Sequence, residues 1–226
     1  TVASELANVG HDVSHVIVVR YTGNDIVEHS RDSWSHDLVA KVEAEMLADA
    51  KVADRAGLNG LDDNAFWRAV GAKAPAVPVE ANWPLFIIYT SGSTGKPKGV
   101  VHTHGGGLSG ITHTLRTVFN ANQDDCLYVI GDPGWITGQS YQIAAPLAFG
   151  MSTVVAEGSP LFPHAGRFAS IIERNNVTLF KAGSTFLKAV MTDPASTQEM
   201  SRYDMSSLKA GTFCAEPVSP AVQQFA

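Results

Sequence analysis

Runs of apolar residues separated by polar stretches divide the chain into a regular series of expected elements. After residue 120, four apolar runs are typical of strands, at Cys126–Ile130, Thr153–Ala156, Val177–Phe180 and Leu208–Phe213. Helical spacing occurs at Leu108–Phe119, Tyr141–Phe149, Gly166–Asn175 and Thr185–Thr192. The strand centres, near residues 128, 154, 179 and 210, are 26, 25 and 31 residues apart. This alternation predicts an α/β fold, with a mostly parallel sheet and helices on both of its faces.

The first third of the chain has a less regular pattern. Residues 16–21 (VIVVRY) are typical of a buried strand, and the turn TGND follows them. From Ser33 to about Ala56 the apolar spacing is helical. A short helix is expected around Phe66 and Trp67. The residues 74–79, rich in Ala, Pro and Val, are expected to form an extended surface connection.

A strongly apolar run, Trp83–Tyr89, leads directly into a loop that has almost no apolar side chains. We expect this run to be a buried parallel strand, and α/β proteins bind ligands where such strands end. The loop offers the hydroxyls of Thr90, Ser91, Ser93 and Thr94, the glycines Gly92, Gly95 and Gly99, and the amines of Lys96 and Lys98. Glycines let backbone N–H groups approach a ligand, and lysines add charge-assisted hydrogen bonds. The pattern therefore predicts a polyphosphate site.

The loop differs from the phosphate-binding P-loop. That motif begins with a glycine five residues before its second glycine and ends in Lys-Ser or Lys-Thr. Here Thr90 occupies the first of these positions, and Pro97 follows Lys96. A flexible surface loop is the other interpretation, but such a loop would not need two lysines flanking a proline directly after an apolar strand.

The composition agrees with an ordinary globular protein. The 226 residues are 45% hydrophobic and 17% charged, and the net charge of -6 argues against a nucleic-acid partner. No apolar run approaches the roughly 18 residues of a membrane span, and the first residues lack the pattern of a signal peptide. The two cysteines, Cys126 and Cys214, form no disulfide or metal pattern, so a cytoplasmic location is expected.

Two other kinds of chemistry are disfavoured by the residue pattern. His102 and His104 are two residues apart, but no third metal ligand lies nearby, so we expect a structural role. A serine hydrolase would need a Gly-x-Ser-x-Gly turn, which the chain lacks.

Four stretches of the sequence resemble a known family. The stretch YTSGSTGKPK, residues 89–98, resembles the phosphate loop of adenylate-forming (AMP-binding) enzymes, which include acyl-CoA synthetases, adenylation domains and luciferases. The segments GDPGWITGQSYQIAAPLAFG (131–150) and FCAEPVSP (213–220) resemble acetyl-CoA synthetase-like short-chain acyl-CoA synthetases, as does the segment 22–39. The synthetase part of propionyl-CoA synthase is one relative that the resemblance suggests. Nearly the whole chain is covered.

The resemblance implies that residues 1–226 are a central slice of the large N-terminal domain of such an enzyme. The catalytic C-terminal lid domain is expected elsewhere on the full-length chain. The implied reaction has two steps: a small carboxylic acid attacks Mg²⁺·ATP to give an acyl-adenylate, and coenzyme A then displaces AMP. Acetate, propionate or 3-hydroxypropionate is the expected acid. A nucleotide-binding module without catalysis, or an adenylation domain for another carboxylate, remains an alternative.

The resemblance also assigns residues to sites. ATP contacts are implied for Thr90, Ser91, Gly92, Ser93, Thr94, Gly95, Lys96, Lys98, Ala215, Glu216 and Pro217. Lys98 is the implied catalytic residue and Thr94 the implied Mg²⁺ ligand. The acyl pocket is implied to include Trp135, Ile136, Thr137 and Cys214, with Thr137 also near coenzyme A.

Several of these residues have simpler interpretations. Glu216 could be a carboxylate that stabilises a helix N-terminus, and Trp135 could be an ordinary packing residue. Cys214 is expected to be a pocket wall and not a nucleophile. Asp132 is expected to cap the turn that follows it. The chain departs from the family pattern at Ala215, where glycine is usual, at Gln139, where histidine is common, and at Leu161, where asparagine is common.

Overall fold

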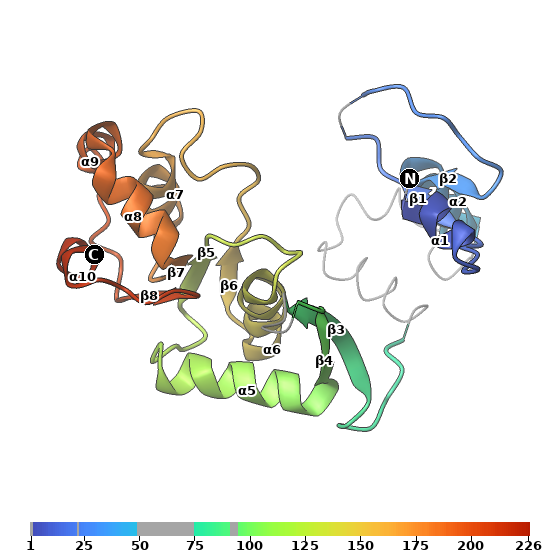
Figure 1. Ribbon diagram of the computed structural model, residues 1–226, viewed down its shortest axis with the longest axis horizontal. Coiled ribbons are helices and arrows are strands. Elements are labelled where there is room, and N and C mark those ends of the chain that lie inside the picture. The colour runs from blue at the N-terminus through green and yellow to red at the C-terminus, as the bar shows by residue number, and fades with distance from the viewer. Residues whose placement is uncertain (1, 22, 49–74, 91–94) are drawn as a thin grey trace. The chain divides into compact units, whose positions relative to one another are not determined.

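The computed structural model describes residues 2–21, 23–48, 75–90 and 95–226 (Figure 1), without the side chains of residues 2–4, 43 and 46–48. The chain divides into two compact units, Thr1–Val77 and Pro78–Ala226. Each unit is described by itself below.

The first unit holds two short strands and two helices, α1 (Val2–Asn8), β1 (Val16–Val18), β2 (Asp32–Trp34) and α2 (Ser35–Ala48). The two strands pair in parallel, with Val16 opposite Asp32. Trp34 donates a hydrogen bond to Glu28 at 2.9 Å, and the Arg20 guanidinium lies 4.6 Å from the centroid of the same ring.

Two predictions for this unit need correction. The strand expected at 16–21 is only three residues long, and Ile17 is 65% exposed, because a two-stranded sheet leaves its faces uncovered in the described part of the unit. The predicted helix starts at Ser35, not Ser33, because Asp32–Trp34 pairs with β1. Its continuation beyond Ala48 and the helix expected around Phe66 lie outside the described residues.

The second unit contains the parallel sheet that the sequence predicts. Its elements are β3 (Pro84–Thr90), β4 (Lys98–Thr103), α5 (His104–Thr117), β5 (Cys126–Val129), η1 (Gly138–Ala144), α6 (Ala145–Phe149), β6 (Ser152–Val154), α7 (Arg167–Asn175), β7 (Leu179–Gly183), α8 (Ser184–Thr192), α9 (Pro194–Met200), β8 (Ala210–Cys214) and α10 (Pro220–Phe225). Four strands form a sheet in the order β6-β5-β7-β8, and all its pairs are parallel. The α/β prediction is confirmed.

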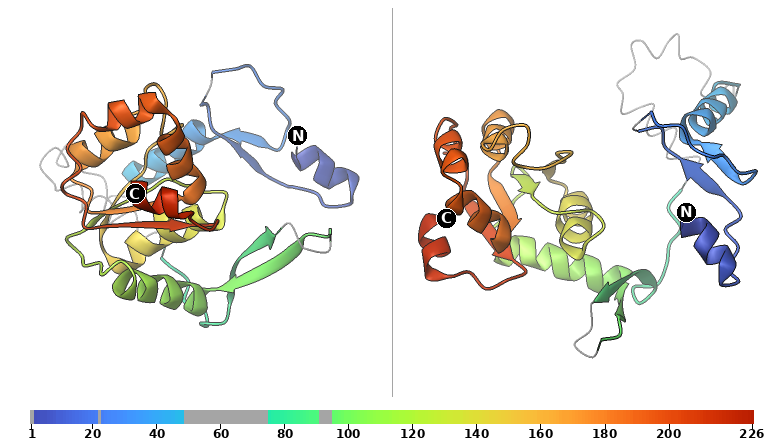
Figure 2. Two further views of the ribbon diagram at one scale, coloured as in Figure 1. Left: turned by 60° about the vertical axis from the view of Figure 1, so that its left-hand side comes forward. Right: turned by 45° about the horizontal axis from the view of Figure 1, so that its top comes forward.

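Helices cover both faces of this sheet, because alternate residues of each strand point to opposite sides. On one face, Leu127 and Leu179 pack with Leu115 of α5 and with Phe119, two residues beyond the end of that helix. On the other, Tyr128, Phe168, Ile172, Phe180 and Val190 form a second core with α7 and α8. The left view of Figure 2 shows α7, α8 and α9 on one side of the strands and α5 on the other.

The strand before the glycine-rich loop is not part of the parallel sheet, and this part of the prediction was wrong. β3 pairs antiparallel with β4, so the loop is the tip of a hairpin. The strand is also not buried: Tyr89 is 69% exposed, because β3 and β4 form a sheet of two strands within the described chain. Phe86 stacks on His102 with ring centroids 4.7 Å apart.

Smaller differences concern the helices. The expected helix Tyr141–Phe149 starts earlier and has two parts, the π-helical η1 and then α6. Helix α9 was not predicted, because it is short and mostly polar. Its start is fixed by Asp193, whose carboxylate accepts hydrogen bonds from the backbone N–H of Ala195 and Ser196 at 3.1 Å. None of the helices in the described ranges is both long and apolar enough for a membrane span.

A fully buried carboxylate holds the starts of three parallel strands together. Asp125, just before β5, accepts hydrogen bonds from Lys209 Nζ at 2.6 Å, Thr178 Oγ1 at 2.8 Å and the backbone N–H of Asn122 at 2.9 Å. Burial raises the pKa of Asp125, but these hydrogen bonds and the charge of Lys209 outweigh it and hold the pKa below its usual value. The network therefore stabilises the ionised form.

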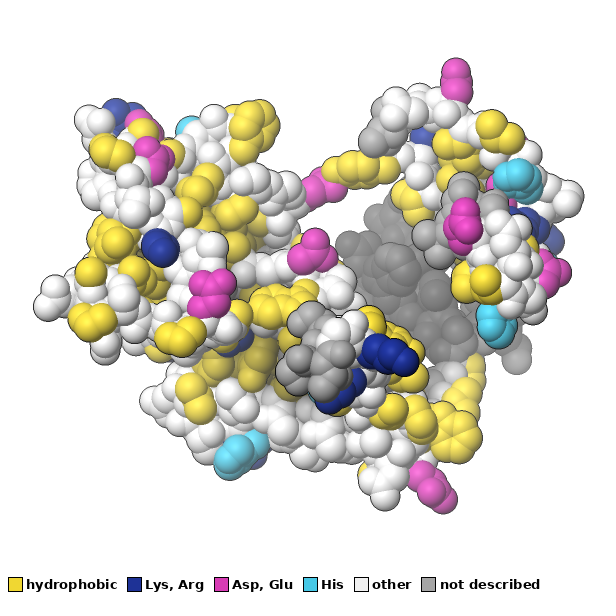
Figure 3. Space-filling view, in the orientation of Figure 1, with side chains coloured by type: hydrophobic (Ala, Val, Ile, Leu, Met, Phe, Trp, Pro, Cys, Tyr) yellow, Lys and Arg dark blue, Asp and Glu magenta, His cyan; other side chains and the backbone are white. Residues whose placement is uncertain are grey.

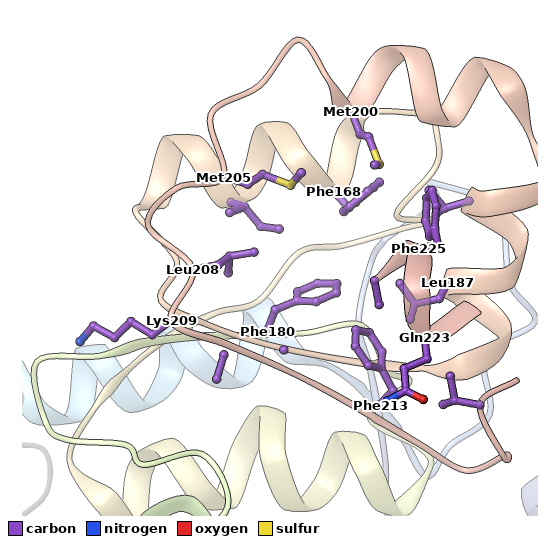
Figure 4. A pocket seen from close by; sticks show the side chains of 16 residues that line it. Phe168, Phe180, Leu187, Met200, Met205, Leu208, Lys209, Phe213, Gln223 and Phe225 are labelled. Atoms are coloured by element: carbon purple, nitrogen blue, oxygen red, sulfur yellow. The ribbon is translucent and has the colours of Figure 1, made fainter. Parts of the chain in front are cut away.

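An apolar cavity of about 670 Å³ lies between β7, β8 and the helices α7 to α10. In Figure 4, the labelled apolar side chains point toward one another around it, and Lys209 extends away from it. Figure 3 shows hydrophobic side chains gathered on the surface over α8, α10 and β8.

Candidate functional site

The hairpin of β3 and β4 holds the glycine-rich loop at its tip. Thr90 and Lys98 are opposite one another at the end of the ladder, and Thr90 Oγ1 lies 3.5 Å from the Lys98 carbonyl oxygen. Gly95 has a φ of 79°, which other residues rarely adopt, so a glycine is needed where the chain turns back. Four predicted ATP-binding residues, Ser91, Gly92, Ser93 and Thr94, lie outside the described residues.

The two loop lysines are exposed. Among the ion pairs of the described chain, none involves Lys96 or Lys98. Figure 3 shows basic side chains gathered over the tip of this hairpin. Two exposed ammonium groups beside a glycine turn, with no carboxylate partner among the described residues, are suited to bind a strongly anionic ligand.

A tight turn, residues 131–137, follows strand β5. Asp132 Oδ1 accepts a hydrogen bond from the backbone N–H of Gly134 at 2.7 Å, so Asp132 caps the turn as the sequence predicts. A Cβ at Gly138 would lie 2.1 Å from the Asp132 carbonyl oxygen, so only glycine fits there. Gln139 donates a side-chain hydrogen bond to the Pro133 carbonyl oxygen. Gln139 therefore helps to fix the turn that carries Trp135, Ile136 and Thr137.

This turn connects the hairpin to the parallel sheet. Ile136 lines a cavity of about 220 Å³ together with Leu85, Phe86 and His102 of the hairpin. The next residue, Thr137, is buried, and its Oγ1 lies 3.8 Å from Cys214 Sγ at the end of β8. Residues 77 positions apart in the sequence therefore meet at this turn.

The four predicted acyl-pocket residues are not all brought together. Thr137 and Cys214 are in contact, and Cys214 also lies 3.8 Å from the Ala182 carbonyl oxygen. Ile136 faces the hairpin cavity instead. Trp135 is 45% exposed. The pocket assignment of Trp135 and Ile136 stays a prediction.

Glu216 follows strand β8 at the carboxyl edge of the sheet, and hydroxyls from the start of α8 hold it. Thr185 Oγ1 donates to Glu216 Oε2 at 2.6 Å. The buried Ser184 Oγ lies 3.2 Å from the Glu216 carbonyl oxygen and 3.4 Å from Oε2. The preceding residue, Ala215, has a φ of 78°. The segment Ala215–Pro217 is thus fixed against the segment that follows β7.

Ser184 and Thr185 are residues that the sequence reasoning missed. Both follow the parallel strand β7 directly. Polar side chains at that position often reach the ligand edge of an α/β sheet. This signal was present in the sequence AGST (182–185), but its partner Glu216 lies 31 residues beyond Thr185.

A metal centre made only of protein side chains is not found in the described part of the chain. No group of three or more His, Cys, Asp or Glu side chains there could hold an ion. His102 stacks on Phe86 within the hairpin, and His104 is the first residue of α5, so the two histidines belong to different elements. The predicted Mg²⁺ ligand, Thr94, lies outside the described residues.

The fold is that of an α/β protein whose parallel sheet carries polar side chains just beyond the carboxyl ends of its strands. The chain belongs to the family of AMP-binding enzymes, whose family profile matches residues 3–226. The family resemblance seen in the sequence is confirmed.

Several curated proteins similar to the chain are named acetyl-coenzyme A synthetase 1 or 2. The chain is 37% identical over 217 residues to acetyl-coenzyme A synthetase 2 of Eremothecium gossypii. The matched residues are 95% of the chain and 27% of that protein. The chain is 39% identical over 210 residues to acetyl-coenzyme A synthetase 2 of Saccharomyces cerevisiae, covering 92% of the chain and 26% of that protein. For the protein of that name from Debaryomyces hansenii, the identity is 44% over 151 residues, 67% of the chain and 22% of that protein. The chain thus spans about a quarter of the length of these relatives.

Proposed function

We propose that the chain is the ATP- and acid-binding part of an AMP-forming acyl-CoA synthetase for short carboxylic acids. The family membership and the names of the relatives support this activity. The observation that carries it is the turn at residues 135–137. There Ile136 lines one cavity together with residues of the hairpin that holds the lysine loop, and Thr137 contacts Cys214 directly before the Ala215–Pro217 segment.

The proposed reaction has two steps, and both take place between the lysine loop and the Ala215–Pro217 segment. A carboxylate oxygen of the acid attacks the α-phosphorus of ATP, the bond to the β-phosphate oxygen breaks, and pyrophosphate leaves. The thiol of coenzyme A then loses its proton and attacks the acyl carbon. The bond from that carbon to the phosphate oxygen breaks, and AMP leaves. Such transfers depend mainly on positioning and on charge stabilisation.

The residues of this chain bind and orient the reactants in this proposal. Lys98 and Lys96 donate hydrogen bonds to the outer phosphates of ATP and stabilise the charge of the leaving pyrophosphate. Glu216, held by Thr185, and its neighbours Ala215 and Pro217 contact the adenosine part. Mg²⁺, when bound, neutralises phosphate charge, and in nucleotide sites it rests largely on phosphate oxygens and water. Thr94 stays its proposed protein contact.

The identity of the acid is a further part of the proposal. The relatives are named for acetate, which supports a two-carbon or three-carbon acid. Thr137 and Cys214 form the wall that we propose for the acyl group, with Thr137 also facing coenzyme A. Trp135 is proposed to limit the chain length. The lid domain expected on the full-length chain would supply the remaining groups.

The experiment is an exchange of labelled pyrophosphate into ATP by the full-length gene product. Exchange should require a short acid, and coenzyme A should then convert that acid to its thioester. Lys98→Ala should lower the exchange rate about 10- to 150-fold, as expected for one lost charge-assisted contact. Lys188→Ala, which removes an exposed lysine on α8, is the matched control and should leave the rate unchanged.

The alternative function, a nucleotide-binding module without catalysis, gives a different outcome. ATP would then bind, for example by a shift in melting temperature, but no acid would support exchange. If Lys98→Ala and Lys188→Ala behave alike while exchange continues, the phosphate-binding role of the loop is wrong.

A further inference from the structure

Lys181, a lysine that is largely buried, has no role in the mechanism described so far. Lys181 lies in the middle of β7 and is 7% exposed. Its Nζ lies 4.6 Å from the ring centroid of Tyr141 and 5.6 Å from that of Phe119. No carboxylate in the described ranges pairs with it. Aromatic faces attract a cation but offer no lone pair to its N–H donors.

A second polar group without a partner lies beside it. Thr212 of β8 is directly opposite Lys181 in the parallel ladder, so both side chains point to the same face of the sheet. The Thr212 Oγ1 atom is buried and has no hydrogen-bond partner among the described residues. Because buried polar groups are normally hydrogen-bonded, this hydroxyl, next to a lysine that is only 7% exposed, suggests that a ligand completes the pair.

Cys214, a residue of the proposed acyl site, lies on the same face of the sheet as Lys181 and Thr212. Gly183 and Cys214 are opposite one another, each two residues beyond Lys181 and Thr212, so they lie on this face about 7 Å further along the strands. Apart from Gly183 and its two chain neighbours, no heavy atom of the described structure lies within 4 Å of the position that a Cβ at Gly183 would occupy. The Thr137 Oγ1 atom lies 3.8 Å from Cys214 Sγ. The open position at Gly183 is therefore next to the acyl site, and Lys181 and Thr212 lie deeper.

We propose that Lys181 and Thr212 bind an oxygen at the far end of the acid, so that the enzyme selects short acids with a hydroxyl or a second carboxylate. This inference rests on the proposed function. The ammonium group donates to either kind of oxygen, and the threonine hydroxyl donates or accepts. An unsubstituted acid would put a methyl group there and leave both groups unpaired, which is a strong basis for rejection.

The test compares acids in the pyrophosphate exchange assay with the full-length gene product. Propionate, 3-hydroxypropionate and malonate are matched in length and differ only at the far end, so the last two separate a hydroxyl from a carboxylate. The variants are Lys181→Met, Thr212→Val, and Lys188→Met as the control. Thr212→Val is nearly isosteric and carries the test if Lys181→Met does not fold. The KM for ATP reports whether each variant keeps its nucleotide site.

The wild type should prefer 3-hydroxypropionate or malonate to propionate by about 10- to 150-fold in kcat/KM, the range for one charge-assisted hydrogen bond. Lys181→Met should remove most of this preference, Thr212→Val part of it, and Lys188→Met none. The KM for ATP should not change. A wild type that uses propionate equally well overturns the inference, as do variants that slow all three acids alike. Exchange with no acid at all would contradict the proposed function as well.

Discussion

Ala215 lies in a backbone conformation that favours glycine. Its φ is 78°, and it stands directly between Cys214 and Glu216, both of which belong to the candidate site. The left-handed conformation costs a residue with a Cβ about 1–2 kcal/mol. The structure thus explains why the family pattern has glycine at this position, and it shows that the chain tolerates local strain there.

We therefore predict that Ala215→Gly stabilises the protein by about 0.5–1 kcal/mol, after allowing for the greater freedom of glycine in the unfolded chain. Ala189→Gly, at an exposed site inside α8, should instead destabilise by about 1 kcal/mol. Thermal unfolding of both variants checks the difference. A loss of stability in Ala215→Gly comparable to that of the control would mean that the left-handed conformation is not present.

Thr185 is predicted to act through Glu216, since its hydroxyl donates a hydrogen bond of 2.6 Å to that carboxylate. Thr185→Val should raise the KM for ATP about 2- to 10-fold, the range for one lost hydrogen bond, and should change kcat less. Thr185→Ser keeps the hydroxyl and should restore the KM. The control is Thr192→Val. In the wild type, the Thr192 hydroxyl donates to backbone carbonyls of α8, away from Glu216. Equal effects of Val and Ser at position 185 would exclude this role.

At the scale of elements, Asp125 joins strands that start far apart in the sequence. It precedes β5, Thr178 precedes β7 and Lys209 precedes β8. A carboxylate that is fully buried at this position aligns three strand starts, and therefore also their ends at the candidate site, where Thr137, Ser184 and Cys214 lie. The network acts on the site only by holding the strands in register.

This network predicts a pH-dependent stability. Because the pKa of folded Asp125 lies below the usual value of 3.8, the ionised form contributes stability that is fully present above pH 3.8 and is lost as the pH falls through the folded pKa. Asp125→Asn should cost about 1–3 kcal/mol near neutral pH and much less in acid. Unfolding by urea at several pH values checks this. A cost that stays constant down to the acid range would contradict the predicted ionisation.

The helices and strands of the second unit also show what the sequence could predict at this scale. The four parallel strands were found because each is an apolar run of the right length between amphipathic segments. Helix α9 was missed because a short polar helix that begins at Pro194 has no apolar period, and its start depends on the Asp193 cap. The antiparallel pairing of β3 with β4 was also missed. The residues of β3 are apolar although several are exposed, so their pattern resembles that of a buried parallel strand.

At the scale of the whole molecule, the motifs were easier to predict than the tertiary contacts between them. The loop lysines, Thr137, Cys214 and Glu216 were recognised from local patterns. The contact of Thr137 with Cys214 depends on the strand order, which the sequence does not state. Lys181 drew no attention because a single lysine in an apolar run resembles the end of a strand, and only the ladder places it opposite Thr212.

The central claim is that a carboxylate attacks the α-phosphate of ATP, and the fate of the carboxylate oxygen tests it most directly. The full-length gene product is supplied with ATP, coenzyme A and a short acid labelled with oxygen-18 in its carboxylate, and the nucleotide product is analysed by mass spectrometry. We predict AMP that carries one labelled oxygen, together with unlabelled pyrophosphate. Formation of ADP, labelled inorganic phosphate, or AMP without the label would contradict the proposed function.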